Sequence, residues 1–419
     1  MKRHKSNSNT KPIKGSEGTM IGYSGRKPVY IRDNAKHVFV CGTTGSGKTV
    51  ALSNYIQQGV KKDYPMLIID GKGDCGEGSI YDIVKRQKGN KRLYVVNLTN
   101  PIKSDLYNPF KNATPTIAKD MLINLTEWSE EHYKLNTERY LQRLLQLLAL
   151  NGTQLSFKSI LSYMSIDKFS RLSSQLLKAE LITKDEHLSN MDIVKTSGKI
   201  SENAFARFSL IAESELGYIF NETGIDIYTA LAEKAIILFI LNPLIFPEMS
   251  PLVGRLLLID SKKAISKLFG KNDNRTFFIM DEINSYASPV LTDLVNKSRS
   301  ANITCILATQ SLSDLDFAVD EAFKEQIIEN CNNYIVMRQN SAVNAENWAN
   351  ILGTMSTMEV TYQLQQQGLN IAETGFGSAK RVREFLYHPD DIKNMQTGEA
   401  IYLSRDTKFN SRIKVNKPF

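Results

Sequence analysis

The residues with the clearest chemical potential run from Gly42 to Thr49. They fit the pattern G-x-x-x-x-G-K-[ST], in which glycines let backbone N–H groups gather around nucleotide phosphates. In such a loop Lys48 is placed for the β- and γ-phosphates, and the Thr49 hydroxyl for Mg²⁺. The residues predicted to form this phosphate loop are Gly42, Thr43, Thr44, Gly45, Ser46, Gly47, Lys48 and Thr49. A plain turn rich in Gly, Ser and Thr is the alternative.

An acidic pair follows a second apolar stretch. Residues 276–280 are rich in strand formers and lead directly to Asp281 and Glu282. Asp281 is predicted to hold Mg²⁺, usually through water, and Glu282 to polarise the attacking water as a general base. An acidic turn after a strand is the alternative, and the phosphate loop elsewhere in the chain weakens it.

Two further polar groups follow apolar stretches. Residues 303–308 end in Thr309 and Gln310, and an amide at the tip of a buried strand suits a sensor of the γ-phosphate. An ordinary loop Gln is the competing interpretation. The loop 70–74 (Asp-Gly-Lys-Gly-Asp) follows another apolar stretch, at the kind of strand end where an open α/β sheet places ligands. A plain tight turn fits that loop equally well.

The candidate site residues must be positioned by secondary-structure elements. The pattern of apolar residues along the chain predicts strands and helices in alternation. The phosphate loop lies between an apolar strand, 38–41, and a helical pattern that begins near Val50. We predict an α/β fold with a mainly parallel central sheet, preceded by two short strands in 19–31. Near the C-terminus, residues 342–369 are predicted to be mostly helical, 375–383 to form a basic loop, and 400–403 to be the last strand.

About a hundred residues interrupt the strand signal. From Thr114 to Leu216 the apolar residues repeat at helical spacing, as in the leucine-rich stretch 140–148. The predicted divisions are a disordered basic tail (1–17), a first part of the nucleotide-binding domain (18–113), an inserted all-α domain (114–216) and a second part (217–419).

Composition narrows the class of protein. The chain has 419 residues, a formal net charge of +8 and a pI near 9.0, which mildly favours a polyanionic partner. Its four cysteines form no C-x-x-C pair, so we expect no disulfides and no zinc site. The longest apolar run, 235–241, is far shorter than the roughly 20 residues of a membrane helix. These features predict a soluble, cytoplasmic protein.

Together, the phosphate loop, the 70–74 loop, Asp281-Glu282 and the stretch 308–310 (Ala-Thr-Gln) resemble the type IV secretion coupling proteins, conjugative ATPases of the FtsK/HerA superfamily. The resemblance covers residues 18 to 404. It implies a RecA-like P-loop NTPase motor domain with an inserted all-α subdomain, assembled as a homo-hexamer. It also implies ATP and Mg²⁺ as cofactors, and transfer of single-stranded DNA, attached to a relaxase, to a type IV secretion channel.

The resemblance also assigns a possible arginine finger. Arg299 lies eleven residues before Gln310, where the family places an arginine that reaches the neighbouring subunit's ATP. Lys297 is the rival for this role, and a cation favoured by the C-terminal dipole of its helix is the structural alternative for Arg299.

The chain departs from the family in one respect, because many coupling proteins carry N-terminal transmembrane helices and none is evident here. Recruitment to the inner face of the membrane would then require a membrane-anchored adaptor or the secretion machinery. A HerA-like ATPase that processes duplex DNA with a nuclease partner is the main alternative function. A docking module that only binds nucleotide is disfavoured by Glu282 and Gln310, and a GTPase by the absence of an N-K-x-D signature.

Overall fold

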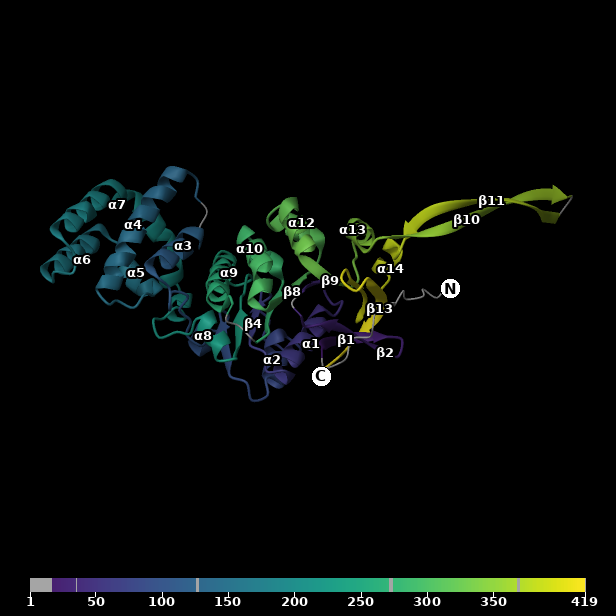
Figure 1. The fold of residues 1–419 in the computed structure, drawn as a ribbon, viewed down its shortest axis with the longest axis horizontal. Helices are drawn as coiled ribbons and strands as arrows, with labels where there is room; N and C mark the ends of the chain where they lie inside the picture. Colours follow the sequence, from purple (N-terminus) through teal and green to yellow (C-terminus); the bar gives the residue numbers. More distant parts are fainter. Residues whose placement is uncertain (1–16, 35, 126–127, 271–273, 368–369, 419) are drawn as a thin grey trace.

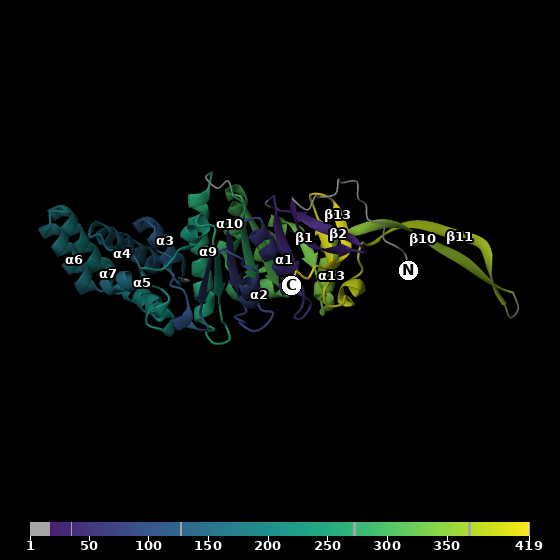
Figure 2. The same cartoon turned by 90° about the horizontal axis from the view of Figure 1, so that it is seen from below.

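The computed structural model describes residues 17–34, 36–125, 128–270, 274–367 and 370–418. The tail predicted for residues 1–17 lies, apart from Glu17, outside these described residues. The described chain is elongated, with a large sheet in the middle, a group of helices at one end and a long β-ribbon at the other (Figure 1). Figure 2 shows the same arrangement from a direction turned by 90°.

One sheet of eleven strands forms the centre of the described structure, and most of its strands are parallel. The parallel strands are, in spatial order, β9 (Cys331–Val336), β3 (His37–Cys41), β8 (Ile303–Thr309), β7 (Thr276–Asp281), β4 (Met66–Asp70), β6 (Ile236–Ile240) and β5 (Leu93–Asn97). Beyond β9 the antiparallel strands are β12 (Glu399–Ser404), β13 (Phe409–Val415), β1 (Gly18–Ser24) and β2 (Lys27–Arg32). The predicted mainly parallel sheet is thus confirmed.

The strand predicted at residues 400–403 is confirmed as β12, but it is not the last strand, because β13 follows and pairs along the whole of β12. Its apolar residues are too interrupted by polar ones to give a strand signal alone. Pairing with β12 and burial of Ile413 and Val415 stabilise it.

The strands of the parallel part are buried on both faces. In β3 the residues alternate between two cores: Val38 and Val40 pack with the helix after the phosphate loop, and Phe39 and Cys41 pack on the opposite face. Helices α1 (Lys48–Lys61) and α2 (Ile80–Gln87) cover the first face. The other face is covered by α9 (Met249–Leu268), α10 (Pro289–Ser298), α11 (Leu312–Ala318), α12 (Glu321–Asn330) and α13 (Ala342–Leu352). All four cysteines are free thiols, as predicted.

The helical stretch is inserted between β5 and β6. Its helices are α3 (Pro115–Leu125), α4 (Glu131–Leu150), α5 (Phe157–Tyr163), α6 (Ile166–Lys178) and α7 (Lys184–Ala212). Tyr107, which leads into these helices, bridges Phe220 and Ile225, which lead out of them, so the chain enters and leaves at one place. The short helix α8 (Ile227–Ala232) then returns the chain to β6. The exact limits of the inserted domain, 114 and 216, stay a prediction.

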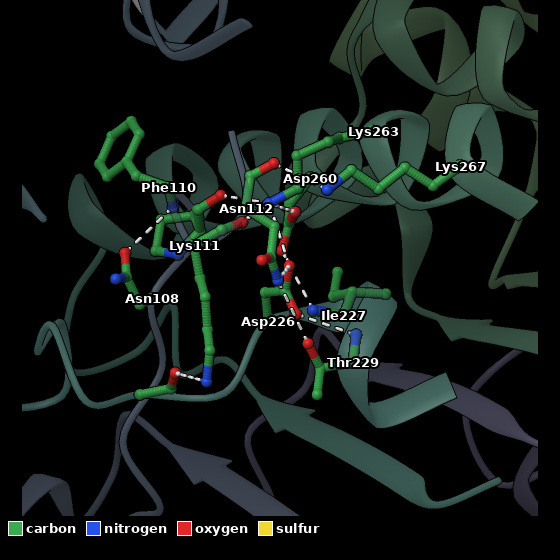
Figure 3. Close-up of polar contacts among 12 residues, drawn as sticks. Asn108, Phe110, Lys111, Asn112, Asp226, Ile227, Thr229, Asp260, Lys263 and Lys267 are labelled. Atoms are coloured by element: carbon green, nitrogen blue, oxygen red, sulfur yellow. Dashed lines mark hydrogen bonds and ion pairs between the residues drawn. The ribbon is translucent and has the colours of Figure 1, made fainter. Parts of the chain in front are cut away.

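A buried polar network fastens this junction to α9 (Figure 3). The Lys263 ammonium forms ion pairs with Asp260 at 2.8 Å and with Asp226 at 3.4 Å, and donates to the backbone carbonyl of Pro109 at 2.6 Å. The Tyr107 hydroxyl donates to Asp260 at 2.6 Å. Both carboxylates are fully buried, so these partners are needed to offset the loss of hydration.

The helix predicted over residues 342–369 is correct only as far as Leu352. Gly353, with φ of 101°, ends α13, and the chain continues as β10 (Thr354–Gln367) and β11 (Asn370–Phe385). The two strands form an antiparallel ribbon that projects from the body (Figure 1), so the loop predicted at 375–383 is also wrong. The local sequence favours a helix here, but pairing between strands that are distant in sequence, such as Thr354 with Phe385, stabilises the ribbon instead. None of the helices within the described ranges is long and apolar enough to cross a lipid bilayer.

Candidate nucleotide-binding site

The phosphate loop connects the carboxyl end of β3 to the start of α1, as the sequence predicts. Gly45 and Gly47 have φ values of 75° and 109°, which an L residue with a side chain rarely adopts. A Cβ atom at Gly42 would lie 2.6 Å from the Ser46 hydroxyl oxygen. Because the first N–H groups of α1 have no partner inside the helix, they are available to an anion at this end.

Lys48 is the first residue of α1, and its ammonium folds back over the loop. It donates a 2.6 Å hydrogen bond to the backbone carbonyl of Gly42 and contacts no carboxylate within ion-pair distance among the described residues. Thr49 follows on the first turn of the helix, beside it. A single cation held only by a carbonyl is poised to exchange that partner for a phosphate.

The acidic pair ends β7, two strands from the phosphate-loop strand. Glu282 has left-handed backbone angles (φ 50°, ψ 50°) at the turn into the 3-10 helix η3 (Ile283–Tyr286). Its Oε1 accepts a 2.6 Å hydrogen bond from the side-chain amide of Gln310, and Thr44 donates to the amide oxygen of Gln310 at 3.1 Å. A chain of hydrogen bonds therefore joins the phosphate loop to Glu282 through Gln310.

Asp281 is a buried carboxylate, only 5% exposed. Burial is the main cause that raises its pKa to about 6, the neighbouring Glu282 charge raises it further, and the Lys48 charge opposes both. It forms no salt bridge within the described part of the chain. The backbone N–H of Glu282 donates a hydrogen bond to Asp281 Oδ1 at 3.0 Å.

These donors fit a divalent cation with oxygen ligands, because carboxylate, hydroxyl and phosphate oxygens are what Mg²⁺ prefers. Asp281 and Thr49 are the residues that could hold it. Among the described residues there is no group of three or more His, Cys, Asp or Glu side chains placed around a metal. A cation here would therefore complete its shell with water and phosphate oxygens.

Arg299 does not join this group within one subunit. It follows α10, in the 3-10 turn η4 (Arg299–Ala301), and is exposed at the amino ends of the strands. The Arg299 charge contributes to the lowered pKa of His37, which is the first residue of β3. The phosphate loop follows the last residue of β3, so Arg299 and the loop lie at opposite ends of this strand. Lys297, two residues before Arg299, is also exposed.

The structure adds residues that the sequence analysis missed. The N–H of Thr43 donates to the carbonyl of Arg338 at 2.9 Å, and the Thr397 hydroxyl donates to the carbonyl of Gly45 at 3.0 Å. The N–H of Gly398 also donates to the carbonyl of Ser46 at 2.9 Å. The position of Arg338, after a parallel strand, was a usable signal. Residues 397–398 carry no such signal, because they precede an antiparallel strand.

The loop after β4 lies beside the acidic pair. Asp70, its first residue, is in register with Asp281 on the neighbouring strand, and the N–H of Gly71 donates to the Asp281 carbonyl at 3.2 Å. Burial, followed by the Asp281 charge, raises the pKa of Asp70 to about 7. The loop therefore contributes a second buried carboxylate to this edge of the sheet.

A model of the type IV secretion-system coupling protein DNA-binding domain matches residues 23–415 of the chain. The chain belongs to this coupling protein family. The predicted resemblance to the coupling proteins is thus confirmed over nearly the whole of this chain. A relative from Mycoplasma pneumoniae, an uncharacterized protein, is 35% identical over 101 residues, which are 24% of this chain and 67% of the relative.

Solved structures share the fold of this coupling protein at low sequence identity. The bacterial conjugative coupling protein TrwBdeltaN70 is 16% identical, with a TM-score of 0.66 over 97% of this chain and 90% of that one. The plasmid coupling protein TrwB in complex with ADP and Mg²⁺ is 15% identical, with a TM-score of 0.65 over the same shares. VirB4 of Thermoanaerobacter pseudethanolicus is 14% identical, with a TM-score of 0.55 over 97% of this chain and 98% of that one. The likeness confirms the predicted α/β P-loop NTPase fold, RecA-like and with a helical insertion.

Proposed function

We propose that this coupling protein is an ATP-hydrolysing motor that moves single-stranded DNA, attached to a relaxase, to a type IV secretion channel. The observation that carries the proposal is the hydrogen-bond chain from Thr44 through Gln310 to Glu282. Such a chain links the position of a γ-phosphate to the orientation of a general base, which hydrolysis needs and mere nucleotide binding does not.

Each residue then has a defined task. The loop N–H groups and Lys48 bind the phosphates, and Thr49 and Asp281 hold Mg²⁺. When bound, Mg²⁺ neutralises charge on the phosphate oxygens. Glu282 accepts the proton of the attacking water, while Gln310 fixes the Glu282 carboxylate. The solved structure of TrwB in complex with ADP and Mg²⁺ supports the choice of nucleotide and metal.

Assembly and location belong to the same proposal. The exposed Arg299 at the opposite edge from its own phosphate loop is suited to complete a neighbouring subunit's site, as in a homo-hexamer. The net charge of +8 suits sequence-independent binding to DNA phosphates. We place the protein in the cytoplasm, recruited to the inner face of the membrane by an anchored adaptor or by the channel.

The test is the ATPase rate per subunit over a range of protein concentrations, with no DNA, single-stranded DNA or duplex DNA of equal length. We expect the rate to rise with concentration and to rise further with single-stranded DNA, with a gain that shrinks as salt increases. A low rate that is indifferent to concentration and DNA would contradict a motor. Greater stimulation by duplex DNA would favour the HerA-like alternative, a DNA-processing or defence ATPase with a nuclease partner.

A further inference from the structure

Asp70 is a buried carboxylate to which the phosphate-loop and acidic-pair motifs assign no task. It is the last residue of β4, is 2% exposed, and is in register with Asp281 at the end of β7. Neighbouring parallel strands lie about 4.8 Å apart, and residues in register point to the same face. The two carboxylates therefore stand side by side.

The face they share is the one that carries the phosphate loop's helix. Side chains alternate along a strand, so Asp70 lies on the same face as Ile68, and Asp281 on the same face as Ile279. Both isoleucines belong to the core that packs against α1, the helix that begins with Lys48 and Thr49. Asp70 and Asp281 consequently extend this face toward the start of α1.

The backbone around Asp70 is fixed against the acidic pair. The N–H of Lys72 donates to Asp70 Oδ1 at 2.9 Å, and the N–H of Gly71 donates to the Asp281 carbonyl at 3.2 Å. A Cβ atom at Gly71 would lie 2.8 Å from the carbonyl oxygen of Glu282, so only glycine permits this approach. The loop thus holds the Asp70 carboxylate in one position relative to Asp281.

Two adjacent buried carboxylates repel each other, and in the described chain neither forms a salt bridge. Such a pair is costly unless one carboxylate takes up a proton or a cation is shared between them. The ammonium of Lys48 donates to the Gly42 carbonyl, and that of Lys72 forms an ion pair with Asp74 at 3.7 Å. Neither ammonium forms an ion pair with Asp70 or Asp281 in the described chain, and a divalent cation is the further positive charge that this site would hold.

We propose that Asp70 is a second carboxylate of the Mg²⁺ site, which accepts a hydrogen bond from a water on the metal while Asp281 serves the metal from the adjoining strand. One strand spacing suits contact through water, because a direct Mg²⁺–oxygen bond is only about 2.1 Å long. Asp70 is thus a positioning residue. This inference rests on the proposed function, since it assumes that the nucleotide is bound with Mg²⁺.

The experiment measures metal binding directly, in full-length protein saturated with ADP, with Mn²⁺ as a paramagnetic replacement for Mg²⁺. We expect Asp70→Asn to weaken Mn²⁺ binding about 10-fold or more, as loss of an outer-shell partner does at other metal sites. Affinity for ADP in EDTA should stay within about threefold of wild type. Asp74→Asn, a more exposed carboxylate of the same loop, is the matched control and should change neither quantity.

Folding is controlled by thermal melting without metal, where Asp70→Asn should be at least as stable as wild type because it removes repulsion with Asp281. The double variant with Asp281→Asn should lose less Mn²⁺ affinity than the product of the two single losses, because both groups serve one cation. Unchanged Mn²⁺ affinity in Asp70→Asn, with a loss in Asp281→Asn, would overturn the inference and leave the proposed function standing. Wild-type protein that binds no ADP would instead refute the proposed function.

Discussion

The side-chain amide of Gln310 donates a 2.6 Å hydrogen bond to Glu282, across the gap between two neighbouring strand ends. The same side chain accepts from Thr44 of the phosphate loop. A glutamine can do both because its amide carries a donor and an acceptor, so Gln310 transmits the position of the loop to the proposed base.

Replacement of Gln310 should therefore slow hydrolysis without preventing nucleotide binding. We expect Gln310→Ala to lower kcat by about 10²-fold or more, the range in which a general base contributes, while the KM for ATP changes little. Steady-state kinetics measures both constants, and Gln326→Ala, an exposed glutamine on α12, is the control. A Gln310→Ala enzyme with normal kcat would show that the hydrogen bond to Glu282 is dispensable.

Glu282 itself should be required for turnover and not for binding. Glu282→Gln keeps the shape of the side chain and removes its capacity to accept a proton, so hydrolysis should be abolished while ATP still binds. Isothermal titration with ATP and a single-turnover assay separate the two effects. Substantial hydrolysis by Glu282→Gln would refute its assignment as the base.

Lys48→Ala should impair nucleotide binding, the step that precedes hydrolysis. The Lys48 ammonium is bound only to the Gly42 carbonyl, so its loss removes the cation that would meet the β- and γ-phosphates. Nucleotide affinity and turnover should both fall, as fluorescent nucleotide titration and ATPase assays would measure. Lys61→Ala, at the exposed far end of the same helix, is the control and should behave as wild type.

His37 should make the folded protein sensitive to acid. Burial, and to a smaller extent the Arg299 charge, lowers the pKa of His37 from 6.5 to about 4, and its Nδ1 accepts from the N–H of Cys305 at 3.0 Å. The unfolded chain then binds a proton more readily than the folded one between pH 6.5 and 4. Stability should fall as the pH drops through this window, by about 3 kcal/mol at most from this group.

Denaturant unfolding at several pH values measures this effect, and His37→Gln is the informative variant. Glutamine keeps a hydrogen-bond acceptor near Cys305 and cannot be protonated, so its stability should depend less steeply on pH between 6.5 and 4. Parallel curves for wild type and variant would show that His37 does not carry the effect.

The site could be predicted from the sequence wherever a strand end and its polar residue are contiguous. Gly42–Thr49, Asp281-Glu282 and Gln310 are of this kind, because the chemistry follows the strand directly. The pairing of Asp70 with Asp281 could not be read in this way, since it depends on which strands become neighbours. Sequence pattern indicates that strands exist, and only the packing of helices on the sheet decides their order.

The β10–β11 ribbon shows the same limit in the fold. The prediction of helix after Leu352 used local pattern alone, whereas the observed strands are stabilised by pairs such as Met358 with Arg381. At the base of the ribbon the paired residues are more than twenty positions apart, as in this pair, and no window of helical length contains both partners. Contacts between residues 397–398 and the phosphate loop were missed for the same reason, at a far greater separation.

Arg299 gives a test of whether the site is shared between subunits. It lies at the amino ends of the strands, away from its own phosphate loop, so it can act on a nucleotide only from a neighbouring subunit. We expect Arg299→Ala to abolish most turnover, since an arginine finger contributes about 10³–10⁵-fold. Its own phosphate loop should still bind ATP.

Mixing two inactive variants then separates a finger from a structural cation. An equal mixture of Arg299→Ala and Lys48→Ala subunits should recover up to about one quarter of the wild-type rate, because one in four interfaces of a ring then pairs an intact loop with an intact arginine. A mixture of Lys297→Ala and Lys48→Ala subunits tests in the same way whether Lys297, the rival of Arg299, is the finger. If the Arg299→Ala mixture stays inactive although the subunits assemble, Arg299 does not act across the interface. If Lys297→Ala alone is inactive and its mixture recovers, the finger is Lys297.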